Sequence, residues 1–308
     1  MIFARFDAET VAQLTASGIF AGTAYGLLGV GFALILGVTG RFHFAYAFTY
    51  TLAAYAIFQL HDWSIPFWIA VVLGVLVTTA VGTGMERAVY RPLAAGAGAT
   101  ALLGVFVASL GLGIAGQNLI SYHYTEQAKN LIGPRQTVHA IWEARFLNFD
   151  MWQAGSSAAL VIILALLLRY TGLGRAIKAT RVNPEMAQII GINPNTIYLT
   201  CFAIGSAFSG VAAFWYGLKF TVQPEMGFRP VIFAFVVAFL AGTASSPIRV
   251  FLVGILVSLL QVYASIWLSA RWTDLAVFVV LVAYLVREAL KGRNILARLF
   301  GSLTPVRA

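Results

Sequence analysis

The chain has 308 residues, of which 60% are hydrophobic and only 10% charged, so it has too few charges to cover the surface of a soluble protein. Its 20 Lys and Arg against 11 Asp and Glu give a net charge of +9, but the basic residues lie between apolar runs and form no stripe for nucleic acid. The single cysteine, Cys201, excludes an internal disulfide, and the four histidines show no short metal-ligand spacing. We expect Cys201 to serve in packing.

Nine apolar runs approach the roughly 20 residues that a helix needs to cross a membrane. The second is only mildly apolar and the last is short, so the predicted fold is an all-α, polytopic bundle of about nine (8–10) transmembrane helices. We expect a single membrane domain over residues 1–308. The runs cover approximately residues 18–40, 43–60, 65–85, 98–121, 151–168, 196–218, 230–246, 250–270 and 275–286.

The charges predict an orientation with the N-terminus outside and the C-terminus in the cytoplasm. Alternating through the nine runs then places 13 of the 20 basic and 3 of the 11 acidic residues inside, Arg41 and Glu86 among them. The inner side carries +10 and the outer side −1, as expected because cytoplasmic loops are enriched in Lys and Arg. Topology therefore explains the net charge, and no nucleic-acid partner is expected. The basic tail beyond Arg293 is predicted to be an anchor at the inner face.

None of the nine runs contains Asp, Glu, Lys or Arg. This argues against a proton-coupled carrier, a voltage-gated channel and a retinal protein, because each needs an ionisable group within the membrane. It also leaves no acid, base or metal site for a membrane enzyme. A sodium-coupled carrier that uses backbone carbonyls remains open. Small residues, such as Gly18 and Gly22, predict close helix packing.

A short helix is predicted in the cytoplasmic segment of about residues 169–195. Asn183 is suited to its N-cap, Pro184 to its first position, Glu185 to its first turn, and Gly191 to a left-handed C-terminal position. The helix would run from Pro184 to Ile190, with Ala187 and Ile190 on one side. Two turns bury little area alone, so we expect this helix either to contact another protein or to be a solvated connector.

Three motifs resemble one family of transport proteins. They are the run 183–193 (NPEMAQIIGIN) preceded by GRAI at 174–177, the run 86–93 (ERAVYRPL), and the opening run 22–38 (GTAYGLLGVGFALILGV). Their order and spacing resemble those of ABC importer permeases of the high-affinity branched-chain amino acid transport type, over most of the chain.

The resemblance implies a membrane subunit of the bacterial inner membrane, without enzymatic activity, that imports a small solute. Implied partners are two cytoplasmic ATPase subunits, a second permease that is related or identical, and a periplasmic solute-binding protein. ATP and Mg would bind to the ATPases, since this chain lacks a Gly-rich phosphate loop and is expected to hold no cofactor. The implied ATPase-coupling residues are Arg181, Asn183, Pro184, Glu185, Ala187, Ile190 and Gly191. The alternative is a self-sufficient sodium-coupled carrier or channel.

The predicted solute is a branched-chain or related amino acid, amide or carboxylate. The choice is wide because residues 43–47 (HFAYA) and 241–246 (AGTASS) depart from the family's patterns. Polar residues within the runs are candidates to line the solute pathway, with interhelical hydrogen bonding as the alternative role; they are His43, Tyr46, Thr49, Asn118 and Gln261. The periplasmic loop at about residues 122–150 is expected to contact the binding protein or to cover the pathway.

Overall fold

The computed structural model describes residues 8–300 apart from residues 95, 97, 126, 132, 135–136 and 142–143. The predicted basic tail is therefore described only to residue 300. Each of the nine predicted runs lies largely within one helix. In chain order these helices are α1 (Ala8–Thr39), α2 (Tyr46–Asp62), α3 (Phe67–Met85), α5 (Gly98–Tyr124), α6 (Asn148–Tyr170), α9 (Pro194–Lys219), α10 (Phe228–Ala241), α11 (Pro247–Trp267) and α12 (Ala270–Phe300).

Shorter elements join these helices. The helix α3 continues through a π-helical turn, η2 (Glu86–Tyr90), into α4 (Arg91–Ala94), while α7 (Gly172–Val182) and α8 (Pro184–Ile189) lie between α6 and α9. The strands β1 (Val138–Ile141) and β2 (Ala144–Leu147) pair antiparallel. This hairpin falls inside the predicted loop 122–150.

The protein is a polytopic helical membrane protein. By length and composition, six of the described helices can cross a membrane, within residues 9–39, 67–94, 100–124, 148–170, 194–219 and 247–267. The apolar helix α10 is shorter, with 14 residues.

The helix α1 packs against α6, α9, α10 and α11. Its closest approach is to α11, where glycines face each other. A Cβ atom added at Gly22 would lie 2.6 Å from the Cα of Ile255, and one added at Gly254 would lie 2.3 Å from the Cα of Gly26. Gly22 thus allows the backbone contact that its sequence position predicts.

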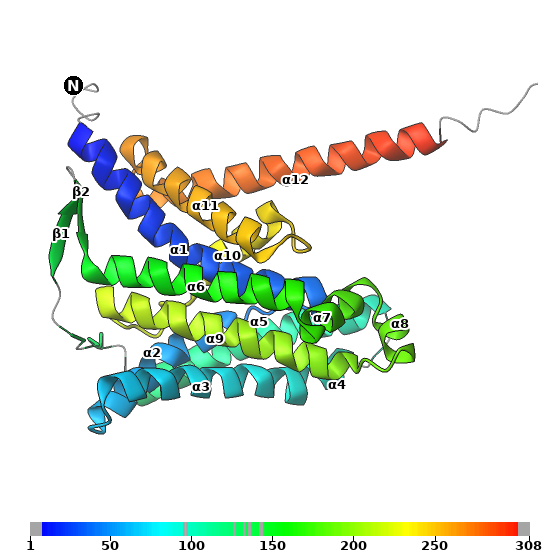
Figure 1. Cartoon of the computed structure of the whole chain (residues 1–308), viewed down its shortest axis with the longest axis horizontal. Coiled ribbons are helices and arrows are strands. Elements are labelled where there is room, and N and C mark those ends of the chain that lie inside the picture. Colours follow the sequence, from blue (N-terminus) through cyan, green and yellow to red (C-terminus); the bar gives the residue numbers. More distant parts are fainter. Residues whose placement is uncertain are drawn as a thin grey trace, which may run out of the picture.

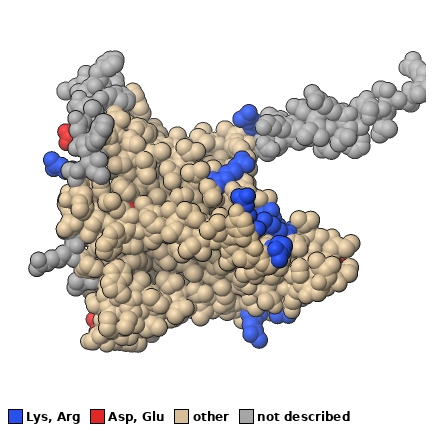
Figure 2. Space-filling model, in the orientation of Figure 1, with Lys and Arg blue, Asp and Glu red and all other residues tan. Residues whose placement is uncertain are grey.

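The two ends of the bundle differ (Figure 1). We call one the hairpin end, where β1, β2 and the start of α1 lie, and the other the α8 end, where α7, α8 and α4 lie. The helix α12 extends away from the other helices. Most of the Lys and Arg side chains visible in Figure 2 gather towards the α8 end.

Arg41 and Glu86, two of the charges that the sequence analysis counts on the inner side, are both buried and form an ion pair with each other. The guanidinium of Arg41 also lies 5.1 Å from the ring centre of Tyr198 in α9. The π-helical turn η2 begins at Glu86, directly after α3. A buried charge requires a partner, so this ion pair holds the loop after α1 against the end of α3.

Candidate functional site

A cavity of about 610 Å³ opens at the hairpin end between α1, α6, α9 and the segment 220–230. We call it the hairpin-end cavity. Its wall is strongly aromatic, with the rings of Phe20, Tyr25, Phe146, Tyr50, Tyr216 and Phe220. Ionisable side chains of both signs also line it, namely Arg145, Asp150, Lys219, Glu225 and Arg229.

Asp150 is held at the start of α6 by two contacts. Its Oδ2 accepts a hydrogen bond from the backbone N–H of Leu147 at 2.9 Å, and its Oδ1 forms an ion pair with Lys219, the last residue of α9. A carboxylate at a helix N-terminus and an ammonium at a helix C-terminus each interact favourably with the helix dipole. The pair therefore fixes α6 against α9 at the cavity wall.

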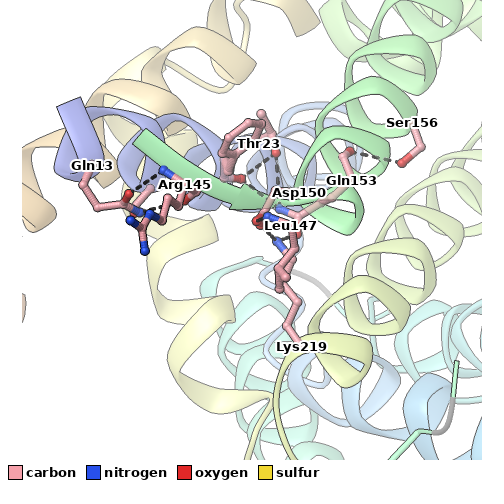
Figure 3. A network of polar contacts seen from close by, with 10 residues as sticks. Gln13, Thr23, Arg145, Leu147, Asp150, Gln153, Ser156 and Lys219 are labelled. Atoms are coloured by element: carbon pink, nitrogen blue, oxygen red, sulfur yellow. Dashed lines mark hydrogen bonds and ion pairs between the residues drawn. The ribbon is translucent and has the colours of Figure 1, made fainter. Parts of the chain in front are cut away.

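Gln153 extends this network to α1, as Figure 3 shows. It lies three residues after Asp150, on the same face of α6. Its Oε1 accepts from the Nζ of Lys219 at 2.6 Å, and its Nε2 donates to the carbonyl of Phe20 at 2.8 Å. On the hairpin, the backbone of Arg145 makes two hydrogen bonds to the side chain of Gln13, at 2.8 and 2.9 Å. Three helices and the hairpin thus meet around one cavity.

The cavity is suited to a small solute that carries both charges and apolar groups. Cations and anions at its edge can meet a carboxylate and an amine, while the aromatic rings offer an apolar wall. Among the described residues, no group of three or more His, Cys, Asp or Glu is placed to hold a metal ion.

The helix α8 lies at the opposite end of the protein. Its N-cap is Asn183, whose Oδ1 accepts hydrogen bonds from the backbone N–H groups of Glu185 and Met186, both at 3.0 Å. Pro184 occupies the first turn, and Gly191 adopts a left-handed φ of +85° just after the helix. These are the capping roles that the sequence predicts for the three residues.

Large apolar side chains are exposed on α8 and beside its two ends, next to the exposed polar residues Glu185 and Gln188. Val182, Met186, Ile189 and Ile190 are 84%, 61%, 78% and 70% exposed. Ala187, in contrast, is 2% exposed, so it does not share an outward side with Ile190 as the sequence analysis expected. The reason is that α8 ends at Ile189, and Ile190 is already the C-cap with φ −89°. Arg181 donates to the carbonyl oxygen of Ala244 at 3.2 Å, which joins α7 to the loop before α11.

His43, Tyr46 and Thr49 lie close together, but all three are fully buried. His43 precedes α2 and its Nδ1 is hydrogen-bonded to the hydroxyl of Tyr90 at 3.0 Å. Tyr46 donates to the carbonyl of Gly205 at 2.9 Å, and Thr49 donates to the carbonyl of Tyr46 at 2.9 Å. These contacts are the interhelical and local hydrogen bonds that formed the alternative to a pathway role.

The other two candidate pathway residues lie elsewhere. Asn118 is exposed on α5 and donates to the carbonyl of Ile114 in its own helix at 2.8 Å. Gln261 donates to Asp274 at 2.8 Å, beside the Arg229–Asp274 ion pair. None of the five candidates lines the hairpin-end cavity.

Sequence reasoning missed the charged residues of that cavity, although a signal was present. Asp150 and Lys219 flank the predicted runs 151–168 and 196–218 on the same predicted side of the membrane. Charges that flank different runs on one side can meet in a bundle, but the sequence alone does not show which runs are neighbours.

Comparison with known proteins gives one family. Residues 14–285 match the model described as "Branched-chain amino acid transport system / permease component". The high-affinity branched-chain amino acid transport system permease protein LivH of Escherichia coli K12 is 26% identical over 287 residues, covering 87% of this chain and 91% of LivH. The corresponding BraD of Pseudomonas aeruginosa is 27% identical and covers 89% and 92%. The permease LivM of Salmonella typhimurium is 27% identical over 253 residues, covering 72% and 57%.

Proposed function

Because this chain belongs to the family of branched-chain amino acid transport system permease components, we propose that it forms the solute pathway of an ATP-driven importer. It is a multi-pass permease subunit of the bacterial inner membrane, and it is not an enzyme. Its proposed solute is a branched-chain or related amino acid, amide or carboxylate. The names of LivH and BraD, which give branched-chain amino acids, support the first of these classes.

In this proposal the hairpin end faces the periplasm and the α8 end faces the cytoplasm. The gathering of basic side chains towards the α8 end supports this orientation (Figure 2), because basic residues favour the cytoplasmic side. The N-terminus is then outside and the C-terminus inside, with about nine membrane helices. Beside the six long apolar helices, α2, α10 and α12 complete that count, and α2 and α10 are packed within the bundle.

The observation that carries the proposal is the exposure of Met186, Ile189 and Ile190 on and beside α8. Large apolar side chains at the end of a membrane protein, beyond the long helices, indicate a protein partner. We propose that Met186, Ile189 and Ile190 dock on a cytoplasmic ATPase, with Glu185 at the edge of the contact. Ala187 and Arg181 hold α7 and α8 in place from the inner side. Two ATPases would bind ATP and Mg, and this chain neither.

The hairpin-end cavity is the proposed place where solute enters from a periplasmic binding protein. The mixed charges and aromatic rings that line it support this role. The loop 122–150, which includes the hairpin at its edge, would contact the binding protein. A second permease chain completes the pathway, and the similarity of both LivH and LivM to this chain supports a related rather than an unrelated second chain.

Copurification tests the coupling proposal. The chain is purified from its native membrane in mild detergent, and bound proteins and ATP hydrolysis are measured for the wild type, Ile189→Asp and a control, Gln188→Asp. Gln188 is exposed on the same helix, so the control adds the same charge outside the apolar set. We expect Ile189→Asp to lose the ATPase and the control to keep it. A chain that purifies alone and still moves solute in liposomes would instead be a carrier or channel.

Filling the cavity tests the solute pathway. Ala24 lines the hairpin-end cavity, whereas Ala115 is exposed on α5 and lies outside it. We expect Ala24→Trp to abolish uptake while the ATPase still copurifies, and Ala115→Trp to transport normally. Normal uptake by Ala24→Trp would place the pathway elsewhere.

A further inference from the structure

A second cavity, which we call the α8-end groove, has a volume of about 480 Å³ and lies between α1, α6, α7 and α11. Its inner wall is apolar and includes the buried side chains of Val30, Leu34 and Leu164. Three cations, Arg169, Lys178 and Arg181, lie among its lining residues, together with the loop 243–246. Among the residues that the structure describes, no Asp or Glu lines it. The groove therefore combines an apolar interior with a purely positive edge.

The charge of this edge is not neutralised within the described chain. None of the three ion pairs in the described part of the chain involves these cations. Arg181 donates to the carbonyl of Ala244, and the guanidinium of Arg169 lies 5.3 Å from the ring centre of Tyr170. Both partners are uncharged, so the groove retains an excess positive charge that favours an anion.

The groove also borders the surface that faces lipid in a membrane protein. On α11, Ile248 lines the groove and is exposed, and Leu252, about one turn further along the helix, is exposed as well. These side chains continue from the groove wall onto the outside of the bundle, along a helix that is long and apolar enough to span the membrane. A ligand with a long apolar part can therefore lie partly in the groove and partly along this surface.

We propose that the α8-end groove binds an anionic phospholipid of the cytoplasmic leaflet. Arg169 and Lys178 bind its headgroup phosphate, and an acyl chain lies against Leu164 and Leu34. Basic pockets between membrane helices on the cytoplasmic side suit anionic headgroups. The leaflet assignment rests on the orientation given under the proposed function. Because Arg181 joins α7 to Ala244 in the same groove, the lipid would lie directly beside the segment that carries α8.

The test compares two lipids with identical acyl chains. The full-length chain, with the partners that copurify with it, is placed in nanodiscs of phosphatidylglycerol, phosphatidylcholine or mixtures of both, and retained lipid is counted by native mass spectrometry. We expect phosphatidylglycerol to be retained at least about tenfold over phosphatidylcholine. Arg169→Gln with Lys178→Gln should remove this preference. Arg87→Gln with Arg91→Gln, two exposed cations at the same end outside the groove, should keep it.

Four results would overturn the proposal. Equal retention of the two lipids would show that the headgroup charge is not recognised, and an unchanged preference in the Arg169 and Lys178 variant would place the lipid elsewhere. Release of the lipid by soluble glycerol phosphate would identify a site for free anions. A cross-link from Ala165→Cys, in the groove wall, to a second permease would show that a protein occupies the groove. Nanodiscs expose both leaflets and the readout needs no transport, so failure of the importer proposal would leave this result intact.

Discussion

Removal of the Asp150 carboxylate should destabilise the protein by an amount that the structure allows us to divide into two parts. The side chains of Lys219 and Asp150 are 13% and 19% exposed. Their pair thus lies between a surface pair, worth about 0–1 kcal/mol, and a buried pair, whose disruption costs about 3–5 kcal/mol. We take about 2 kcal/mol for loss of the charge. Loss of the acceptor for the Leu147 N–H adds about 1 kcal/mol.

Two variants separate these contributions. Asp150→Asn keeps an oxygen that can accept from Leu147 but loses the charge, whereas Asp150→Ala loses both. At about 2 °C per kcal/mol for a large domain, we expect Tm to fall by about 4 °C for the first and about 6 °C for the second. Cys201 provides the assay, since it is the only cysteine and is 0% exposed. A fluorogenic maleimide reacts with its thiol only when the protein unfolds.

The ion pair is checked by a third variant. Lys219→Met combined with Asp150→Asn removes the unpaired ammonium, so it should regain part of the lost Tm relative to Asp150→Asn alone. Glu185→Gln, on the exposed surface of α8, serves as the control and should leave Tm unchanged. A fall of less than about 1 °C in both Asp150 variants would refute the assignment of stability to this network.

Three further predictions concern packing, topology and capping. Gly22→Val should prevent α1 from packing on α11, because the added Cβ would lie 2.6 Å from the Cα of Ile255. Gel filtration should then show no folded peak. The control Gly84→Val should fold normally, since a Cβ atom at Gly84 meets no neighbouring atom within 4 Å. A cysteine introduced at Gln188 should react with an impermeant maleimide only from the cytoplasm, and one introduced at Val138 only from outside. The reverse pattern of labelling would show that the topology is inverted. The native Cys201 is buried and therefore adds little background labelling. Asn183→Ala should destabilise α8 by about 1 kcal/mol and reduce solute-stimulated ATP hydrolysis. Asn183→Asp, which can still cap the helix, should retain this ATP hydrolysis. Equal losses of ATP hydrolysis in the two variants would exclude capping as the cause.

The membrane helices and the caps of α8 were predictable because the information is local, whereas the ends of α1, α10 and α12 differ from the predicted runs. Apolar runs predict membrane helices from length and composition, and Asn183, Pro184 and Gly191 act through backbone groups within a few residues. Close packing at Gly22 was also predictable, although its partner was not. The family could be inferred for the same reason, since its motifs are contiguous runs of sequence.

The site depended on which helices are neighbours, and this the sequence does not contain. Asp150 and Lys219 are 69 residues apart and meet only because α6 packs beside α9. His43, Tyr46 and Thr49 have the spacing of a polar helix face, but the packing of α2 against α9 and the contact of His43 with Tyr90 turn that face into the core. A helical period shows which side chains share a face and not what lies opposite.

By itself, the sequence determined that this chain is a helical membrane protein, where its membrane helices lie, and how the segment around α8 is capped. These follow from the cost of placing charges in lipid and from hydrogen bonds between neighbouring residues. The tertiary structure alone decided that Arg41 pairs with Glu86 inside the protein, that the Ala187 side chain points inward, and that charges from α6, α9 and the hairpin surround one cavity. Each of these depends on contacts between helices that are distant in sequence, where packing selects the partner.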